Sequence, residues 1–284
     1  MSQLFENILV AVDGSHSCLR AKEMAAAIAR EFRSKVTVVH VISHDFMHPE
    51  LKAHHQLPSL VLNELDESYQ KAGTKIIRAA EEFFRDENIE IKSELVRAED
   101  PAEKILQMVK ESKYDLLIMG NISETQAERF SLGSVAEKIS LYAECPVLIA
   151  KRKTKIKKLL VAVDGSEKAE KALQYAIQIC RHLNAKMTLL NVEEAELLRL
   201  EPKVAKQVGE EILAGAATKA KDVTHDTRLE FGNPARTILK MAKQEDYDLI
   251  VLGSRGISSV KRFLLGSVSA DVSMHAQRSV LIVR

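Results

Sequence analysis

The residues with the clearest chemistry form a glycine-containing loop near the end of the chain. Two residues separate Gly253 from Gly256, nine more follow, and Gly266 and Ser267 then begin an expected helix. Glycine lets backbone N–H groups approach a phosphate because it has no Cβ, and a helix N-terminus adds unpaired donors and a partial positive charge. The loop carries a charge of +3 from Arg255, Lys261 and Arg262. This pattern predicts a binding site for a polyanion such as a triphosphate.

A second part of the same site is the sequence Asp164-Gly165-Ser166, which follows a short apolar run. An open parallel sheet binds ligands beyond the carboxyl ends of its strands, near the point where the strand order reverses. Asp164 is placed there to accept a hydrogen bond from a ribose hydroxyl or an adenine edge, and Val192 ends the next strand. Gly-x-x-Gly alone is common in turns, so the interpretation as a phosphate site depends on its combination with this acidic turn.

The chain is an internal duplication. Residues 8–15 read Ile-Leu-Val-Ala-Val-Asp-Gly-Ser, and residues 159–166 read Leu-Leu-Val-Ala-Val-Asp-Gly-Ser. Further along, Tyr114–Gly120 is repeated as Tyr247–Gly253, and a Gly-Ser pair follows each copy at the same distance. A length of 284 residues suits two domains. We therefore expect one domain in residues 1–152 and a second in residues 153–284, with sites that can be compared.

Strands and helices alternate in both halves, which predicts a parallel sheet flanked by helices. Short apolar runs indicate strands buried on both faces, and apolar residues at helical spacing indicate amphipathic helices. Expected strands cover residues 8–12, 35–42, 89–97, 116–119, 146–150, 158–163, 186–192, 224–231, 249–252 and 279–283. Expected helices cover residues 17–32, 60–86, 134–142, 168–183, 197–220, 234–244 and 268–275, with a further one opened by Asp100-Pro101. The fold class is α/β, with a five-stranded, mainly parallel sheet in each half.

The first half keeps the framework of the site but alters its phosphate loop. The retained positions are Asp13, Val41, Gly120, Gly133 and Ser134. Ser123 replaces the second glycine, and serine enters a left-handed conformation only at a cost on the order of 1 kcal/mol or more. Residues 121–132 carry a net charge of −1, from Glu124, Glu128 and Arg129. We predict that this half binds nucleotide weakly, prefers AMP or adenosine to ATP, or is empty. The alternative is that Ser123 adopts the same backbone and the site still fills.

The first half also carries 18 additional residues between its second and third strands, with Ser43–Ser59 as the expected carrier. Five of the nine histidines lie between residues 40 and 55. His44 and His48 would share a helix face that suits zinc, but Pro49 and the lack of a clear third ligand favour a solvated loop without metal. His40 is expected to pack inside a strand. We predict that the insertion forms a lid over the first-half pocket or a contact with a partner.

Composition excludes several classes of protein. The net charge of +1 gives no global field for nucleic acid or an acidic membrane, and no apolar run approaches the roughly 18 residues that span a bilayer. The three cysteines form no Cys-x-x-Cys pair, which fits a reducing cytoplasm, and Cys145 is expected to be a buried, inert thiol. No signal-peptide pattern is present. Six of the eight residues 151–158 are Lys or Arg, and we interpret this junction as a solvated, extended linker.

Together these motifs resemble the universal stress protein family of the UspA type, and the resemblance covers both halves. ATP-binding members of that family carry Gly-x2-Gly-x9-Gly-(Ser/Thr), which the second half matches at every position. The resemblance implies a Rossmann-like fold of the adenine nucleotide alpha hydrolase type. It also implies an acidic strand-end residue at Asp164 and backbone contact with adenine near Val192. The phosphates would lie against Gly256, Gly266, Ser267 and the amide of Val268.

In that family, subunits pair through the last strand, which corresponds here to residues 146–150 and 279–283. Because exposed sheet edges tend to pair, we expect the two halves to form a pseudo-dimer within the chain; assembly of two chains into a homodimer is left open.

The resemblance implies a cytoplasmic, ATP-binding stress-response or regulatory protein. Nucleotide would be held mainly in the second half, with or without Mg²⁺, and the protein would have an unidentified regulatory protein partner. Alternatives are a slow ATPase, which would need a residue that positions water, and a partner-binding scaffold with little affinity for nucleotide. No catalytic residue is assigned.

Overall fold

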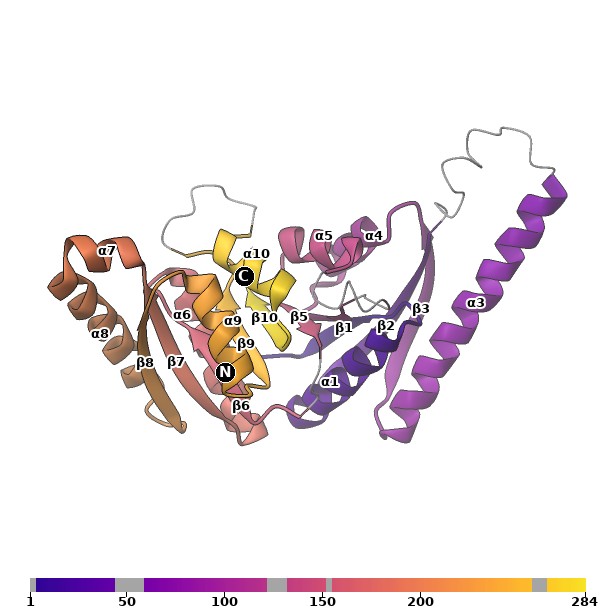
Figure 1. Cartoon of the computed structure of the whole chain (residues 1–284). Helices are drawn as coiled ribbons and strands as arrows, with labels where there is room; N and C mark the ends of the chain where they lie inside the picture. The colour runs from indigo at the N-terminus through magenta and orange to yellow at the C-terminus, as the bar shows by residue number, and fades with distance from the viewer. Residues whose placement is uncertain (1–3, 44–58, 122–131, 152–154, 257–264) are drawn as a thin grey trace.

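Ten strands form one continuous sheet (Figure 1). The computed structural model describes residues 4–43, 59–121, 132–151, 155–256 and 265–284. The strand order is β3-β2-β1-β4-β5-β10-β9-β6-β7-β8, so the second half repeats the first in reverse. Strands of the first half are β1 Asn7–Ala11, β2 Lys35–Ser43, β3 Ile91–Ala98, β4 Leu116–Gly120 and β5 Val147–Ala150. Strands of the second half are β6 Lys158–Ala162, β7 Lys186–Glu193, β8 His225–Phe231, β9 Leu249–Gly253 and β10 Ser279–Val283.

The two halves meet at the pair of last strands. Neighbouring strands within each half are parallel, whereas β5 and β10 pair antiparallel, with Leu148 opposite Leu281. This pairing confirms the expectation that the halves join within the chain through their last strands. The two expected five-stranded sheets are therefore one sheet of ten strands, which ends at β3 and at β8 in the described part of the chain.

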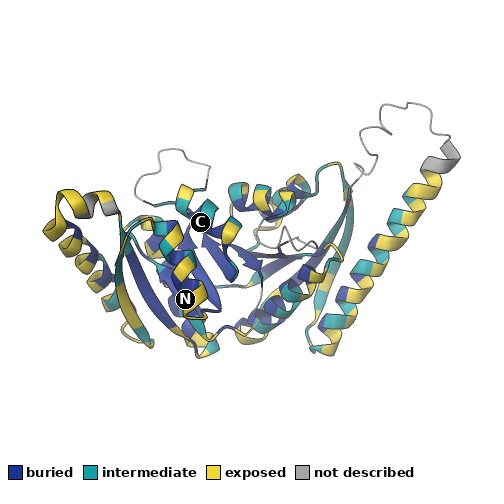
Figure 2. Cartoon of the chain, viewed as in Figure 1, coloured by how far each residue is buried: buried dark blue, intermediate teal, exposed yellow. Residues whose placement is uncertain are grey.

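Helices cover both faces of the sheet. One face carries α1 His16–Phe32, α3 Ser59–Asp86, α6 Glu167–Leu183 and α8 Pro202–Lys219. The other face carries α4 Pro101–Ser112, α5 Ser134–Tyr142, α9 Pro234–Gln244 and α10 Ser267–His275. The inner strands are dark with burial, whereas β3 and β8 at the two ends of the sheet are intermediate or exposed, and the helices expose their outer sides (Figure 2). Alternate strand residues enter different cores, as Leu9 does relative to Ile8 and Val10. Each core therefore belongs to one face of the sheet and runs through both halves.

One expected helix is two helices in the structure. Residues 197–220 were expected to be a single helix, but α7 covers Ala195–Leu200 and α8 begins at Pro202. Proline has no N–H to donate to the preceding turn, so a helix cannot continue through it without losing a hydrogen bond. At the first position of α8 that N–H is not needed. The remaining expected elements agree with the structure to within two residues at each end.

Each half has a glycine in the helix between its second and third strands, and this pair of glycines locates the extra residues of the first half. An added Cβ on Gly73 of α3 would lie 2.9 Å from Leu95 Cδ1, and an added Cβ on Gly209 of α8 would overlap Leu229. The two glycines thus occupy equivalent positions where a helix approaches the sheet. The offset between matching residues is 151 at Asp13, 136 at Gly73 and 133 at Pro101. Fifteen of the 18 extra residues therefore precede this glycine, and three follow it.

The basic junction between the halves differs from the solvated linker that its composition suggested. Lys151 is only 3% exposed and Ile156 is 4% exposed. Lys158 belongs to β6, and its ammonium lies 4.1 Å from the centre of the Tyr247 ring. Residues 152–154 lie outside the described part of the chain. The linker interpretation is wrong at its ends, because the hydrophobic pairing of the halves draws both ends of the junction into the protein.

Gly253 and Gly120, the first glycines of the two loops, have a packing role. An added Cβ on Gly253 would lie 2.6 Å from the backbone carbon of Lys168 and 2.7 Å from the amide nitrogen of Ala169. An added Cβ on Gly120 would meet Ser17 in the same way, at 2.6 Å from its Oγ. A side chain at either position would push the first turn of a helix away from the sheet.

We expect Gly253→Ala to lower the free energy of unfolding by about 1–3 kcal/mol, because the added methyl group overlaps the backbone of α6. Gly215→Ala is the matched control, since this glycine lies in α8 and nothing lies within 4 Å of its added Cβ. Alanine should there raise stability by about 0.5–1 kcal/mol. Urea denaturation followed by circular dichroism measures both changes. A Gly253→Ala protein as stable as the wild type would contradict this close contact.

Candidate functional site

A cavity of about 470 Å³ lies at the carboxyl ends of β6, β7 and β9 in the second half. Its walls include eight of the nine residues expected there from the sequence: Asp164, Val192, Gly253, Arg255, Gly256, Gly266, Ser267 and Val268. Gly165 does not line the cavity. Three segments that are far apart in the sequence thus meet where the strands end, as expected for an open parallel sheet.

The first segment is the turn between β6 and α6. Asp164 Oδ1 accepts a hydrogen bond from the amide of Ser166 at 3.0 Å. Gly165 has φ +80°, a left-handed conformation that favours glycine. The Ser166 hydroxyl accepts from the amide of Ala169 at 3.2 Å, capping α6, and donates to the carbonyl of Arg255 at 3.3 Å. Gly165 therefore shapes the turn, and Ser166 ties that turn to the glycine-containing loop.

The two ends of the glycine-containing loop are fixed to the sheet and to each other. The amide of Ser254 donates to the carbonyl of Val283 at 2.7 Å, and the amide of Gly266 donates to the carbonyl of Ser254 at 2.8 Å. The hydroxyl of Ser269 donates to the carbonyl of Gly253 at 2.7 Å. Because the Gly266 amide already has an acceptor, Gly266 offers close backbone approach to a ligand and no free donor. Lys261 and Arg262 lie outside the described residues.

The start of α10 offers the backbone donors of the cavity. The first hydrogen bond within the helix runs from the amide of Ala270 to the carbonyl of Gly266 at 2.9 Å. The amides of Ser267, Val268 and Ser269 therefore precede the helical ladder. No acidic residue lies in the first turn of α10. The partial positive charge of this helix end is not neutralised by a carboxylate of the helix itself, which suits an anion.

The opposite part of the cavity is apolar, and the sequence reasoning missed most of it. Its walls are Val163, Val192, Val208, Ile212, Pro234 and Ile238. Val208 and Ile212 come from α8, and Pro234 begins α9. The signal that could have identified α9 is Pro234, which begins this helix and has a counterpart at Pro101 in the first half. The cavity therefore combines an apolar end with an anion-binding end.

Gly256 lies against the acidic residue of the first turn. An added Cβ at this position would overlap Asp164 Oδ2. Any side chain at position 256 would therefore displace the Asp164 carboxylate or the loop backbone. This contact gives a physical reason for glycine at the second position of the motif. The absence of a side chain there makes room for the Asp164 carboxylate as well as for a phosphate.

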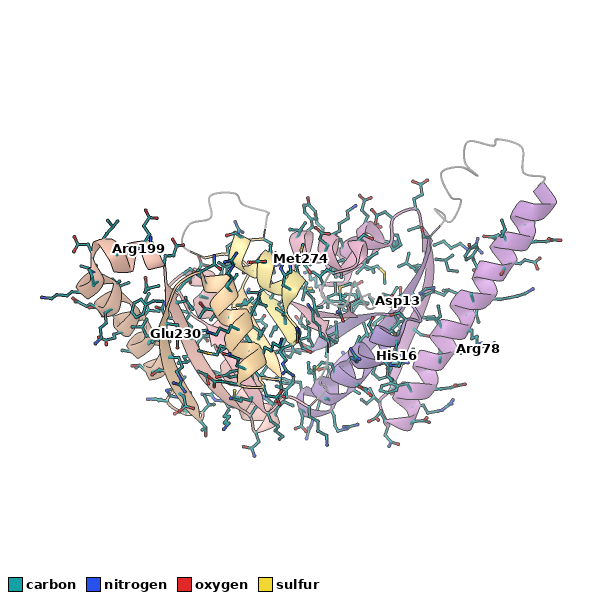
Figure 3. The ribbon with its side chains drawn as sticks, viewed as in Figure 1. Asp13, His16, Arg78, Arg199, Glu230 and Met274 are labelled. Atoms are coloured by element: carbon teal, nitrogen blue, oxygen red, sulfur yellow. The ribbon has the colours of Figure 1, made fainter. Side chains whose placement is uncertain are left out.

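The equivalent positions of the first half have a similar backbone. Asp13 Oδ1 accepts from the amide of Ser15 at 2.9 Å, and Gly14 has φ +79°. Figure 3 shows Asp13 close to His16, where β1 leads into α1. Val41 lies on β2, Gly120 ends β4, and Gly133 and Ser134 open α5. Ser123 and the charged residues beside it lie outside the described residues, as does most of the histidine-rich insertion.

One electrostatic difference between the halves is visible in the described residues. Glu137 lies in the first turn of α5, whereas the first turn of α10 has no acidic residue. A carboxylate there partly neutralises the helix N-terminus that would hold a phosphate. This difference agrees with the weaker phosphate affinity predicted for the first half.

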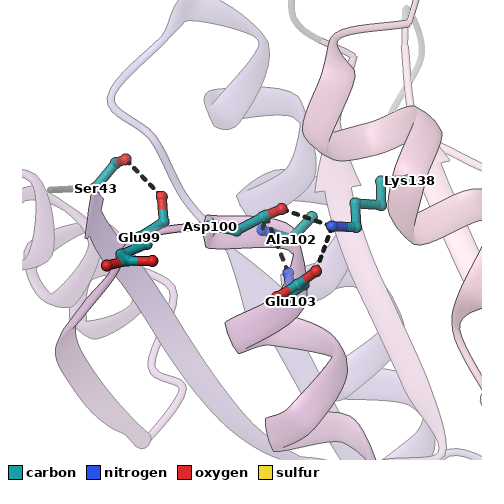
Figure 4. Close-up of polar contacts among 6 residues, drawn as sticks. All are labelled: Ser43, Glu99, Asp100, Ala102, Glu103 and Lys138. Atoms are coloured by element: carbon teal, nitrogen blue, oxygen red, sulfur yellow. Dashed lines mark hydrogen bonds and ion pairs between the residues drawn. The ribbon is translucent and has the colours of Figure 1, made fainter. Parts of the chain in front are cut away.

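An ion-pair cluster joins α4 to α5 in the first half (Figure 4). The Lys138 ammonium lies 2.6 Å from Asp100 Oδ2 and 2.8 Å from Glu103 Oε1. Asp100 also caps α4, accepting from the amides of Ala102 at 2.8 Å and Glu103 at 3.1 Å. Its hydrogen bond to Lys138 is the main reason that the pKa of Asp100 lies below its ordinary value. In the second half, Asn233 caps α9 in place of Asp100, and Asp271 occupies the position equivalent to Lys138. The ion pair between Lys138 and Asp100 therefore has no equivalent at these two positions.

A polar side chain links the first two strands in each half; it is partly buried in the first half and buried in the second. His40 of β2 hydrogen-bonds through Nδ1 to the carbonyl of Val12 at 2.7 Å. Asn191, at the equivalent position of β7, donates to the carbonyl of Val163 at 2.9 Å. Because a carbonyl only accepts, Nδ1 of His40 carries the proton. The expectation that His40 packs within its strand is confirmed.

The cysteines are buried and free. Burial raises the pKa of Cys145 and of Cys180 to about 12, so these thiols stay protonated near neutral pH. This confirms that Cys145 is a buried, inert thiol. Within the described ranges, no group of three His, Cys, Asp or Glu side chains is arranged to hold a metal ion, and no helix has both the length and the apolar character needed to cross a membrane.

The sequence profile of the universal stress protein family matches residues 4–151 and again residues 155–284. The chain belongs to the universal stress protein family. A homologue from Staphylococcus aureus strain USA300 is 39% identical over 141 residues, which are 45% of this chain and 84% of the relative. A homologue from Staphylococcus haemolyticus is 36% identical over 139 residues, with the same two coverages.

Similarity to solved structures extends over the whole tandem chain. A universal stress protein from Archaeoglobus fulgidus aligns with 99% of this chain and 98% of its own, with a TM-score of 0.74 and 20% sequence identity. At this identity the likeness concerns the fold. The family membership and the Rossmann-like α/β fold expected from the motifs are confirmed, and the universal stress protein fold is present twice.

We expect Asp100→Ala to lower the free energy of unfolding by about 1–2 kcal/mol, because α4 loses its cap. Asp100→Asn keeps an oxygen for the cap, as Asn233 does in the second half, and should cost at most about 1 kcal/mol for the lost, partly exposed ion pair. The pKa of Asp100 is lowered from 3.8 by folding, so its contribution is complete above that pH and disappears as the pH falls through the lower, folded value. Urea denaturation at pH 7 and at low pH measures these effects. Equal losses in the two variants would contradict the capping role.

Proposed function

We propose that the second half binds an adenine nucleotide, with ATP as the main ligand, and that the protein acts as a stress-response regulator whose output is a conformation or a partner contact. The observation that carries this proposal is the composition of one cavity. Apolar side chains line one end of it, and a helix N-terminus without acidic residues, together with Arg255, lines the other. A nucleotide has the same two ends, a heteroaromatic base and an anionic tail.

The proposed pose follows from these walls. The adenine lies among the apolar residues of α8, α9 and the end of β7, near Val192. Asp164 accepts from a ribose hydroxyl, since a strand-end carboxylate commonly takes this role. The phosphates lie against the backbone of Gly256 and Gly266 and receive hydrogen bonds from the amides of Ser267 and Val268. Mg²⁺ would bind through the phosphates, because it usually keeps several waters and takes few protein ligands.

The first half is proposed as the weaker site. Glu137 in the first turn of α5 and the net charge of −1 over residues 121–132 both oppose a triphosphate. The replacement of glycine by Ser123 acts in the same direction, through the space that its side chain needs. AMP or adenosine, with less charge, would be tolerated better than ATP.

A regulatory role is favoured over a slow ATPase by the position of the carboxylates. The acidic residues that line the described cavity are Asp164, Glu193 and Glu194. Glu193 is the last residue of β7 and Glu194 follows it. Strand β6 lies between β7 and β9, and β9 leads into the phosphate loop. Hydrolysis needs a group that orients water beside the γ-phosphate. Of these three described carboxylates, that of Asp164 is the one that approaches this loop, through its contact with Gly256.

We expect isothermal titration calorimetry to show a single tight ATP site, and Asp164→Ala to weaken it about 10- to 100-fold, the effect of losing a hydrogen bond to a charged group. Asp13→Ala is the matched variant in the first half and should leave the affinity of the tight site unchanged. If wild type and Asp164→Ala bind ATP equally well, the site is misplaced. Absence of ATP binding by the wild type would favour the scaffold alternative.

Nucleotide that co-purifies with the protein should be intact ATP when analysed by mass spectrometry, because the one described lining carboxylate near the phosphate loop, that of Asp164, is assigned to the ribose in the proposed pose. Gly256→Val should reduce its amount strongly, since the side chain would overlap the Asp164 carboxylate. Release of ADP from ATP over many turnovers by the wild type, lost in Gly256→Val, would support the ATPase alternative instead.

A further inference from the structure

Lys151 follows the last strand of the first half, yet its side chain contacts the second half. Its ammonium donates hydrogen bonds to the carbonyl of Ser273 at 2.9 Å and to the carbonyl of Ala276 at 2.7 Å. Its amide donates to the hydroxyl of Ser279 at 3.1 Å, and Arg20 of α1 donates to its carbonyl at 2.6 Å. Lys151 is therefore held by two backbone carbonyls and one hydroxyl of the second half, and by Arg20 of its own half.

The two carbonyls belong to the C-terminal end of α10. This helix covers Ser267–His275 and has Ala276 as its C-cap. Its other end, at Ser267 and Val268, lines the proposed nucleotide cavity. A cation at a helix C-terminus satisfies carbonyls that the helix leaves unpaired and offsets the partial negative charge there. One short helix thus connects a lysine of the first half with the phosphate end of the second-half site.

The duplication provides a matched contact in the opposite direction. Arg284 follows β10 as Lys151 follows β5, and its guanidinium donates to the carbonyl of Ser140 near the end of α5. Ser140 and Ser273 are equivalent residues, since both pairs are separated by 133 positions. Each half therefore places a cation on the last turn of the helix that opens the site of the other half. The Arg284 contact also shows that this arrangement accommodates a guanidinium.

We propose that Lys151 is a positioning residue for the nucleotide site of the second half, because its ammonium fixes the C-terminal end of the helix whose N-terminal end holds the phosphates. This inference rests on the proposed function. The lysine touches no part of the cavity, so it acts through α10. Nucleotide binding in the second half is thereby coupled to a residue that follows the last strand of the first half, at the junction of the two halves.

The coupling has a pH dependence with a definite sign. Burial lowers the pKa of Lys151 to about 7, so the ammonium is present below this pH and is lost above it. Charged and titratable groups on the elements that contact Lys151 include Arg20 of α1, Asp271 and His275 of α10, and Arg278 before β10. His275 is paired with Asp271 at 2.6 Å and Arg278 with Asp246 at 2.7 Å. ATP affinity is expected to fall as the pH rises through 7.

The test compares the full-length wild type with Lys151→Met and Lys151→Arg by calorimetry, using ATP and adenosine as ligands between pH 6 and 8.5. At pH 6, Lys151→Met should bind ATP about two- to fivefold more weakly, the size of a charge effect at a helix end. Adenosine affinity should stay unchanged, because adenosine has no phosphate for α10. Lys151→Arg should restore ATP affinity and abolish the decline that the wild type shows with rising pH. Titration of the ATP phosphate itself is common to all three proteins.

Several outcomes overturn the inference. Unchanged ATP affinity in Lys151→Met does so, as does an equal loss of ATP and adenosine affinity, which indicates general loosening. If Lys151→Met does not fold, the pH series of the wild type and Lys151→Arg decides, and parallel curves reject the role of Lys151. Failure of the proposed function is recognised separately, because the wild type then binds no ATP at any pH.

Discussion

The antiparallel pairing of β5 with β10 is the contact on which the rest of the molecule depends. Without this pairing, each of these two apolar strands would lie at an open edge of its sheet, with unpaired backbone N–H and C=O groups. Pairing joins both halves into one sheet of ten strands, and it allows each hydrophobic core to continue from one half into the other. It also places Lys151 and Arg284 on the last turns of helices that belong to the opposite half. A duplicated sequence thereby becomes a single folding unit.

Within this symmetric frame, the electrostatics of the two halves differ. The Asp-Gly-Ser turn, the helix-packing glycine and the polar link between the first two strands, made by His40 or Asn191, recur in both. The charges around the helix that opens the site do not. Glu137 lies in the first turn of α5 and Lys138 pairs with Asp100, whereas the first turn of α10 contains no acidic residue. The described Asp-Gly-Ser turn has a similar backbone in both halves, while the stronger affinity for a triphosphate is proposed for the second half.

The glycines show how far local sequence patterns can be interpreted. The spacing of Gly253, Gly256 and Gly266 suggested a common purpose in phosphate binding. In the structure, Gly253 permits close packing against α6, Gly256 lies against the Asp164 carboxylate, and Gly266 caps α10 with its amide already bonded. Spacing identifies a loop that leads into a helix. The atoms that approach each glycine come from distant segments, so their identity could not be predicted from the loop alone.

The sequence by itself determined the duplication, the order of strands and helices, and the residues that meet at the carboxyl ends of the strands. These follow from apolar periodicity and turn chemistry, which act over a few residues. Only the tertiary structure decided that Lys151 is buried, that α8 and α9 supply the apolar wall of the cavity, and that the cores divide by sheet face. The physical reason is that burial and partner choice depend on contacts between segments far apart in the chain. For Lys151, the antiparallel pairing of β5 with β10 brings those segments together.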